Sequence, residues 1–133
     1  MSIHESGQMY LETIYILSQT KSYVRAIDVG EYLGYSKPSV SRAMSILKKD
    51  GYVLVDGDGA LTLTQSGMEI AQTMYTRHTV LSEMLMRLGV DEKTAAEDAC
   101  RIEHVISETS FSAVQKHLEW GSAQGGDTPQ ERQ

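Results

Sequence analysis

Residues 26–63, AIDVGEYLGYSKPSVSRAMSILKKDGYVLVDGDGALTL, contain the pattern that decides the fold. Apolar residues recur at helical spacing in 26–33 and again in 36–49, and a glycine lies in the short turn between the two segments. Ser36 is a suitable N-cap for the second segment, and Pro38 lies in its first turn, where a missing N–H costs no hydrogen bond. The pattern is typical of a helix-turn-helix, whose second helix enters the major groove of DNA.

Helical spacing then gives way to two short β-forming segments, 52–55 and 60–63. The turn between them alternates aspartate with glycine, which is typical of a hairpin. A hairpin directly after the DNA-reading helix predicts the wing of a winged helix-turn-helix domain. Asp56 and Asp58 would repel phosphate at its tip, so we expect the wing to orient the domain rather than to add affinity.

The predicted reading helix is basic in an otherwise acidic chain. The net charge is −6, whereas residues 34–49 hold four basic residues and no acid. Arg42 has paired donors that match O6 and N7 of guanine, so we expect it to read a base edge. We expect Ser36 and Ser39 to contact bases or backbone, and Pro38 to touch a thymine methyl group. The predicted contacts to double-stranded DNA are Ser36, Lys37, Pro38, Ser39 and Arg42.

Helical patterns dominate the rest of the chain, so we expect a mostly α fold. One helix is predicted before the helix-turn-helix, over residues 5–18. Three more follow the hairpin, the first of them capped by Thr64, over residues 65–88, 91–107 and 110–120. The sequence therefore predicts a winged helix-turn-helix domain at 1–64, a helical domain at 65–120 and a disordered tail at 121–133.

The predicted helical domain carries more apolar residues than three helices can bury between themselves. This surplus predicts that the domain packs against a second copy of itself. A homodimer also suits a helix-turn-helix, because two reading helices must reach major grooves about 34 Å apart on a palindromic operator. We therefore expect a homodimer on a palindromic double-stranded operator.

The composition also sets expectations about location. The chain has no run of 18 apolar residues and no signal-peptide pattern, so we expect a cytoplasmic protein without a membrane segment. Its single cysteine allows no internal disulfide, which fits a reducing compartment.

Residues 98–104, DACRIEH, place three metal-capable donors close together. In a helix, Cys100, Glu103 and His104 share one face as a thiolate, a carboxylate and an imidazole. Such donors suit Fe²⁺, Co²⁺, Ni²⁺ or Zn²⁺. Taken alone, however, the carboxylate and imidazole of such a helix are ordinarily solvated, and a single cysteine is ordinarily a small buried hydrophobe.

Three further residues are candidates only in combination with that stretch. Met9 and Glu12 lie three apart and share a face of the first predicted helix. By themselves they indicate a core methionine and a solvated charge. His78 lies among apolar residues of the expected helix 65–88, and such a histidine is more often a hydrogen-bonded structural residue than a ligand.

Six separated motifs occur along the chain in this order: MYLETIY (9–15), SKPSVS (36–41), LTQSG (63–67), RH (77–78), GVD (89–91) and CRIEH (100–104). Together they resemble the diphtheria toxin repressor family of metal-dependent transcriptional repressors. The similarity runs from about Met9 to Trp120. In length the chain is similar to the two-domain manganese transport regulators, since the SH3-like third domain of the longer iron-dependent members is missing.

The resemblance implies a principal metal site formed by Met9, Cys100, Glu103 and His104. Met9 and Cys100 are similar to the iron-dependent branch, because the manganese regulators typically have aspartate and glutamate at these positions. Two sulfur ligands should favour Fe²⁺ over Mn²⁺, with Co²⁺, Ni²⁺ or Zn²⁺ able to substitute. The implied helical domain is then a dimerisation and metal-sensing domain.

The resemblance also bears on a second metal site. Ser82 and Ala96 stand where the iron-dependent branch has an acid and a histidine, so its ancillary site is not expected in that form. A site similar to that of the manganese branch, formed by Glu12, His78 and a shared Glu103, is expected instead.

The expected function is a divalent-metal-activated, dimeric DNA-binding repressor that controls metal homeostasis, with Fe²⁺ favoured and Mn²⁺ as the second candidate. The alternative is a winged-helix regulator that senses an organic ligand or oxidation of Cys100. An enzyme with Cys100 as nucleophile and His104 as base is disfavoured, because no orienting acid or oxyanion-binding glycines accompany them. A purely structural zinc site is also disfavoured, since such sites prefer four Cys or His ligands.

Overall fold

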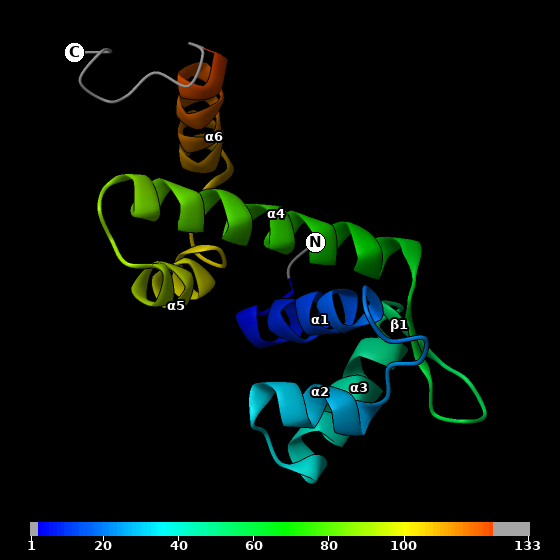
Figure 1. Ribbon diagram of the computed structural model, residues 1–133. Coiled ribbons are helices and arrows are strands. Elements are labelled where there is room, and N and C mark those ends of the chain that lie inside the picture. The colour runs from blue at the N-terminus through cyan, green and yellow to red at the C-terminus, as the bar shows by residue number, and fades with distance from the viewer. Residues whose placement is uncertain (1–2, 124–133) are drawn as a thin grey trace. The chain divides into compact units, whose positions relative to one another are not determined.

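The computed structural model describes residues 3–123, and the side chains of residues 3–119. These residues form α1 (Glu5–Ser18), α2 (Ala26–Leu33), α3 (Lys37–Lys49), β1 (Val53–Val55), β2 (Leu61–Leu63), α4 (Gln65–Arg87), α5 (Glu92–Ile102) and α6 (Glu108–Ala123) (Figure 1). The predicted mostly α fold is confirmed. The chain divides into two compact units, Met1–Tyr75 and Thr76–Gln133. This division falls within α4, and the domain boundary expected after residue 64 stays a prediction.

The first unit is built on α1, α2 and α3 (Figure 1). Their apolar side chains form one core together with those of the hairpin and of the start of α4. Side chains from all three helices are fully buried there, including Leu11, Ile14, Val29 and Val40. Gly34 ends α2 in the left-handed conformation, with φ of 74°, which a residue with a side chain rarely adopts. Ser36 begins α3, because its Oγ accepts a hydrogen bond from the Ser39 N–H at 3.3 Å. The predicted helix-turn-helix is confirmed.

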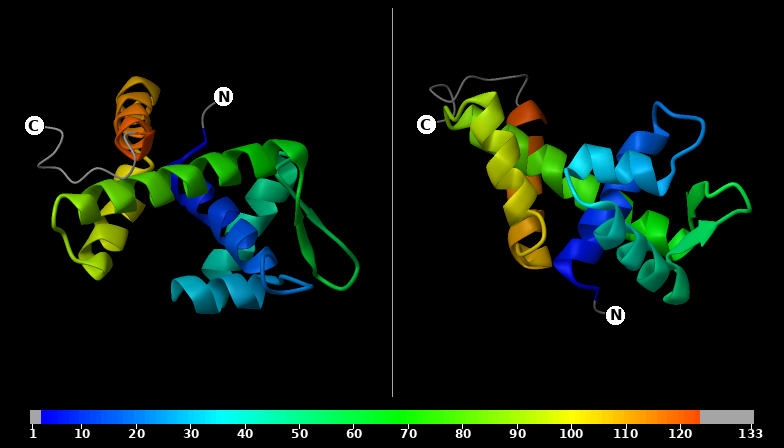
Figure 2. Two further views of the ribbon diagram at one scale, coloured as in Figure 1. Left: turned by 45° about the horizontal axis from the view of Figure 1, so that its top comes forward. Right: turned by 90° about the horizontal axis from the view of Figure 1, so that it is seen from below.

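The hairpin that follows α3 is antiparallel, with Val53 opposite Leu63 and Val55 opposite Leu61. Figure 2 shows it, in green, projecting from the helices of the first unit. Each strand is one residue shorter than expected at its N-terminal end. The Tyr52 N–H instead donates to the carbonyl of Leu47, and the Ala60 N–H donates to the side chain of Asp56.

The passage from the hairpin into α4 is tightly packed. Thr64 caps the helix as expected, since its Oγ1 accepts from the Gly67 N–H at 3.1 Å and donates to the Gly51 carbonyl at 2.7 Å. A Cβ placed on Gly67 would lie 2.2 Å from the Tyr52 carbonyl oxygen. Only glycine therefore allows the first turn of α4 to approach the hairpin this closely.

The second unit is held by apolar side chains of the C-terminal half of α4, of α5 and of α6. Figure 1 shows α5 and α6 on different sides of α4. The core is formed by Leu81, Ala99 and Phe111, with partly buried Val80, Met84, Ile102, Ile106 and Val114 packed against it. Asp91 caps α5 by accepting a hydrogen bond from the Thr94 N–H at 2.9 Å. That hydrogen bond lowers the pKa of the Asp91 carboxyl, because it stabilises the charged form.

The last two helices differ from the expected ranges. α5 was expected to continue to about residue 107, but it ends at Ile102, and Glu103 and His104 lie in the turn that follows. α6 begins at Glu108, two residues earlier than expected, because Ser107 Oγ accepts from the Ser110 N–H at 3.1 Å.

The C-terminal end of α6 also differs. The helix runs to Ala123, so residues 121–123 of the expected disordered tail are helical. The remainder of that expected tail, residues 124–133, lies outside the described residues. None of the helices described in residues 3–123 is long and apolar enough to span a membrane.

Candidate metal centre and DNA-reading face

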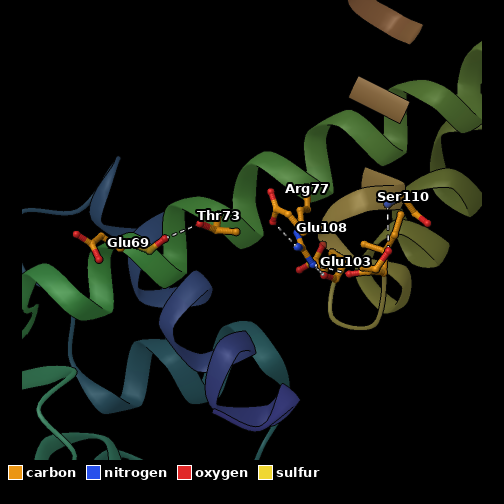
Figure 3. Close-up of polar contacts among 8 residues, drawn as sticks. Glu69, Thr73, Arg77, Glu103, Glu108 and Ser110 are labelled. Atoms are coloured by element: carbon orange, nitrogen blue, oxygen red, sulfur yellow. Dashed lines mark hydrogen bonds and ion pairs between the residues drawn. The ribbon is translucent and has the colours of Figure 1, made fainter. Parts of the chain in front are cut away.

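Arg77, on α4, holds the turn that carries Glu103. Its Nη1 donates to the main-chain carbonyls of Glu103 at 3.1 Å and Ile106 at 2.9 Å, and its Nη2 donates to Glu108 Oε2 at 3.3 Å (Figure 3). The guanidinium also lies over the ring of Phe111, with 5.5 Å between its carbon and the ring centroid. Because one rigid, permanently charged group binds two carbonyls, it holds the backbone of the turn between α5 and α6 in one conformation.

Glu103 is fully buried, at 0 % exposure, and its carboxylate lies against two imidazoles. Oε1 is 2.9 Å from His78 Nδ1, and Oε2 is 3.4 Å from His104 Nε2. The His104 side chain is itself only 3 % exposed, whereas that of His78 is 28 % exposed. A buried carboxylate is costly unless hydrogen bonds or a positive charge compensate it. The arrangement thus brings two imidazoles, one buried and one partly exposed, to one buried carboxylate.

The spacing of these donors fits a divalent ion. Nitrogen and oxygen ligands bind ions such as Zn²⁺ at about 2.0 to 2.2 Å, so two ligands of one ion lie roughly 3 to 3.5 Å apart. The separation of 3.4 Å between Glu103 Oε2 and His104 Nε2 lies in this range, and the 2.9 Å between Glu103 Oε1 and His78 Nδ1 is a hydrogen bond whose length is close to it. Nitrogen with carboxylate oxygen is also a donor combination that first-row divalent metals accept. Glu103 and the two imidazoles therefore form a donor group that such an ion could bind.

Cys100 lies in the last turn of α5 and is exposed, unlike the buried small hydrophobe that a single cysteine ordinarily is. Glu103 follows as the C-cap, with helical φ of −57° and ψ of −29°. The expectation that one helix carries all three donors is wrong for Glu103 and His104, which lie beyond the last helical residue, Ile102. The structure brings Glu103 together with His78, 25 residues earlier in the chain, and with the adjacent His104.

The remaining candidate ligands belong to the first unit. Met9 and Glu12 lie three positions apart on α1, and Glu12 is only 6 % exposed. Glu12 is therefore not a solvated surface charge. Met9 is partly buried, and its Sδ accepts a hydrogen bond from the Tyr35 hydroxyl at 3.5 Å. The Tyr35 ring meets the Tyr10 ring edge-on, and burial, followed by the nearby Tyr35, raises the pKa of Tyr10.

The expected DNA contacts lie on one exposed surface. On α3 the side chains of Val40, Met44 and Leu47 are buried, so the opposite side of the helix faces outward. The exposed residues include all five expected contacts, Ser36, Lys37, Pro38, Ser39 and Arg42. The position of this face at the start of α3 is what major-groove reading by the N-terminal residues of a helix requires.

One aspartate of the wing also has a structural use. Asp56 Oδ1 accepts hydrogen bonds from the Asp58 N–H at 2.8 Å and the Ala60 N–H at 2.9 Å. Arg25 Nε reaches the Asp58 carbonyl at 3.2 Å. The carboxylate of Asp56 therefore shapes the turn, a use that aspartate commonly has in this position.

Sequence reasoning assigned no role to Arg77 or Tyr35. The sequence feature that could have indicated a role for Arg77 is its position next to His78, as a charged residue in an otherwise apolar helix segment. No local pattern marks Tyr35, since its partner Met9 is 26 residues away.

Comparison with known proteins gives the family. The model described as "Iron dependent repressor, N-terminal DNA binding domain" matches residues 2–61, and "Iron dependent repressor, metal binding and dimerisation domain" matches residues 64–120. The chain belongs to the iron-dependent repressor family. Its members are DNA-binding, metal-dependent transcriptional repressors and not enzymes, so the nucleophile–base interpretation of Cys100 and His104 is excluded.

Relatives of this chain include the HTH-type transcriptional regulators MntR of Lysinibacillus sphaericus and Geobacillus thermodenitrificans. They are 34 % and 37 % identical over 109 residues, which are 82 % of this chain and 78 % and 77 % of theirs. Among similar solved structures is that of the manganese regulator SloR, with a TM-score of 0.77 and 26 % identity over 90 % of this chain. Another is a manganese-dependent transcriptional repressor complex with manganese, with a TM-score of 0.77 and 28 % identity over 85 % of this chain. The chain spans 55 % and 52 % of those two structures, about half their length.

Proposed function

We propose that this protein is a homodimeric repressor that binds a palindromic operator when a divalent ion, preferably Fe²⁺, is held by Met9, Cys100, Glu103 and His104. The observation that carries the proposal is the fully buried Glu103 carboxylate between two imidazoles. An ion supplies the positive charge that such a buried anion needs. Genes for metal uptake would then be repressed when the metal is abundant.

A second ion position is proposed at Glu12, His78 and a shared Glu103. Two features support it. The two oxygens of Glu103 lie near different imidazoles, so each oxygen has its own nitrogen neighbour. Glu12 is also buried, which a carboxylate tolerates when a cation compensates its charge. Both proposed positions thus share one carboxylate.

The proposed ligands come from both units, which supports a switch. Met9 and Glu12 belong to α1, in the same unit as the reading helix α3, whereas the other four ligands belong to the second unit. An ion bound by ligands of both units would favour one arrangement of the two α3 helices of the dimer over others. By linkage, operator DNA must then tighten metal binding by the same factor as the metal tightens DNA binding.

The preference for Fe²⁺ rests on two sulfur ligands, Met9 and Cys100. Thioether and thiolate donors suit Fe²⁺ better than Mn²⁺, which favours oxygen. The two similar solved structures are described as manganese-regulated proteins, so Mn²⁺ is the second candidate. Co²⁺, Ni²⁺ and Zn²⁺ are expected to substitute.

The test is metal-dependent binding to an operator selected from random double-stranded DNA by the Fe²⁺-loaded protein under anaerobic conditions. We expect EDTA to abolish binding to the selected operator. Glu103→Gln should remove the stimulation by metal, because it removes the shared charge while keeping the side-chain shape. Glu108→Gln is the matched control, since this glutamate is 80 % exposed and contacts only Arg77 among the described hydrogen bonds.

Two results would count against the proposal. Operator binding that is unchanged by EDTA would favour a regulator that senses an organic ligand or oxidation of the exposed Cys100. Equal losses in the Glu103 and Glu108 variants would show that the loss comes from general electrostatics rather than from metal binding.

A further inference from the structure

Tyr35 occupies an unusual position between a proposed metal ligand and the reading helix. It lies directly before Ser36, the N-cap of α3, and its main-chain N–H donates to the Gly30 carbonyl at 3.0 Å. Its side chain extends to α1, where the hydroxyl donates to Met9 Sδ at 3.5 Å. One residue therefore connects the turn of the helix-turn-helix with the sulfur of Met9.

The Tyr35 side chain is oriented by a second contact. Its ring meets the Tyr10 ring edge-on, with 5.9 Å between centroids and 69° between planes. Such edge-to-face pairs have a preferred geometry, so the hydroxyl is directed at one place on α1. Tyr35 is 43 % exposed, and removing its hydroxyl would not open the core.

A methionine ligand needs such a partner more than most ligands do. Its side chain has three rotatable bonds, and its sulfur is a weak acceptor that is easily moved. Fixing the sulfur before an ion arrives reduces the conformational entropy that ligation costs. The thioether has two lone pairs, so one can accept from Tyr35 while the other stays available to a metal. Groups that orient metal ligands in this way typically change affinity 10- to 100-fold.

We infer that Tyr35 is a positioning residue that directs the Met9 sulfur toward the metal and links that sulfur to the first turn of the reading helix. The inference rests on the proposed function, in which Met9 is a ligand. It implies that a hydroxyl outside the ligand set contributes to metal choice. Its effect should be large for ions that accept sulfur and small for Mn²⁺, which prefers oxygen.

The test is a double-mutant cycle on metal affinity, measured by calorimetric titration of the metal-free, full-length protein with Co²⁺ or Mn²⁺ in the absence of DNA. We expect Tyr35→Phe, which keeps the ring, to weaken Co²⁺ binding about tenfold and Mn²⁺ binding much less. In a Met9→Leu background, Tyr35→Phe should have no further effect on Co²⁺. Tyr32→Phe is the matched control, because Tyr32 is also exposed, at 54 %, and lies in the same helix-turn-helix.

The possible outcomes separate the inference from the proposed function. If Met9→Leu leaves Co²⁺ affinity unchanged, Met9 is not a ligand, and both proposals for this residue fail. If Met9→Leu weakens Co²⁺ binding but Tyr35→Phe does not, only the role of Tyr35 is overturned. If Tyr35→Phe weakens Co²⁺ and Mn²⁺ equally, or acts equally with and without Met9, Tyr35 affects the fold rather than the sulfur, and the inference is wrong. Thermal unfolding of each metal-free variant identifies any loss of folding.

Discussion

Arg77 donates from Nη1 to the main-chain carbonyl of Glu103 at 3.1 Å, which fixes the backbone of the residue whose carboxylate lies between two imidazoles. The Arg77 side chain is only 11 % exposed. Hydrogen bonds from a charged group to a neutral acceptor are stronger than those between neutral groups. The position of Glu103 is therefore set by a side chain that is not a metal ligand.

Arg77→Lys should lower both stability and metal affinity, since lysine cannot bind two carbonyls in the geometry of a planar guanidinium. We expect a loss of about 2 kcal/mol in the free energy of unfolding. Urea unfolding and metal titration would measure the two effects. Arg87→Lys is the control, because Arg87 pairs with Glu83 one helical turn away on an exposed surface, and such pairs contribute little. Equal effects of the two changes would contradict the role of Arg77.

Changing Met9→Asp and Cys100→Glu together should move the metal response toward Mn²⁺. The change replaces two sulfur donors by two carboxylates, which suit a harder ion. Operator binding titrated with Fe²⁺, Co²⁺ and Mn²⁺ would give the order of the metals before and after the substitution. An unchanged order would argue that neither side chain is a ligand.

Arg42→Ala should weaken binding to the selected operator by about 1 to 3 kcal/mol and relax the preference at one base pair. The reason is the loss of paired donors at a guanine edge. Lys49→Ala, at the far end of α3, should reduce binding on all sequences alike and lower the salt dependence. Binding curves on the operator and on its single-base variants would distinguish the effect of Arg42→Ala from that of Lys49→Ala. A uniform loss for Arg42→Ala would instead make Arg42 a phosphate contact.

Asp91 should contribute to stability in a pH-dependent way. Its pKa in the folded protein is lowered from 3.8, chiefly by the hydrogen bond from the Thr94 N–H. The contribution is complete above the ordinary pKa and is lost as the pH falls through the lowered folded value. Asp91→Asn keeps an acceptor for the cap but removes the titration. Unfolding curves measured from about pH 5 downward should fall less steeply for the variant, and parallel curves would contradict this prediction.

Much of the first unit could be predicted from the sequence because local signals decide it. Ser36, Gly34 and the apolar spacing determine where α2 and α3 end and begin. The motif around Thr64 likewise predicted the start of α4. In each case the deciding hydrogen bond or backbone conformation lies within a few residues of the signal.

The turn around Glu103 could not be predicted in the same way. The continuous helical pattern through residue 104 was compatible with a longer helix, and the helix ends where Arg77, 26 residues away, binds the backbone carbonyls. Ser107 was a usable local signal, since a serine followed by an acidic first turn is a common helix start. The contact of Glu103 with His78 also joins residues 25 apart, so only the fold brings them together.

Gly67 has a practical consequence for protein engineering. Replacing a helical glycine by alanine is a routine way to make a protein more heat-resistant. Here that substitution would press a methyl group against the Tyr52 carbonyl, 2.2 Å away, and would push α4 off the hairpin that follows α3. A thermostabilisation programme should leave this position unchanged, although its helix propensity marks it as an attractive target.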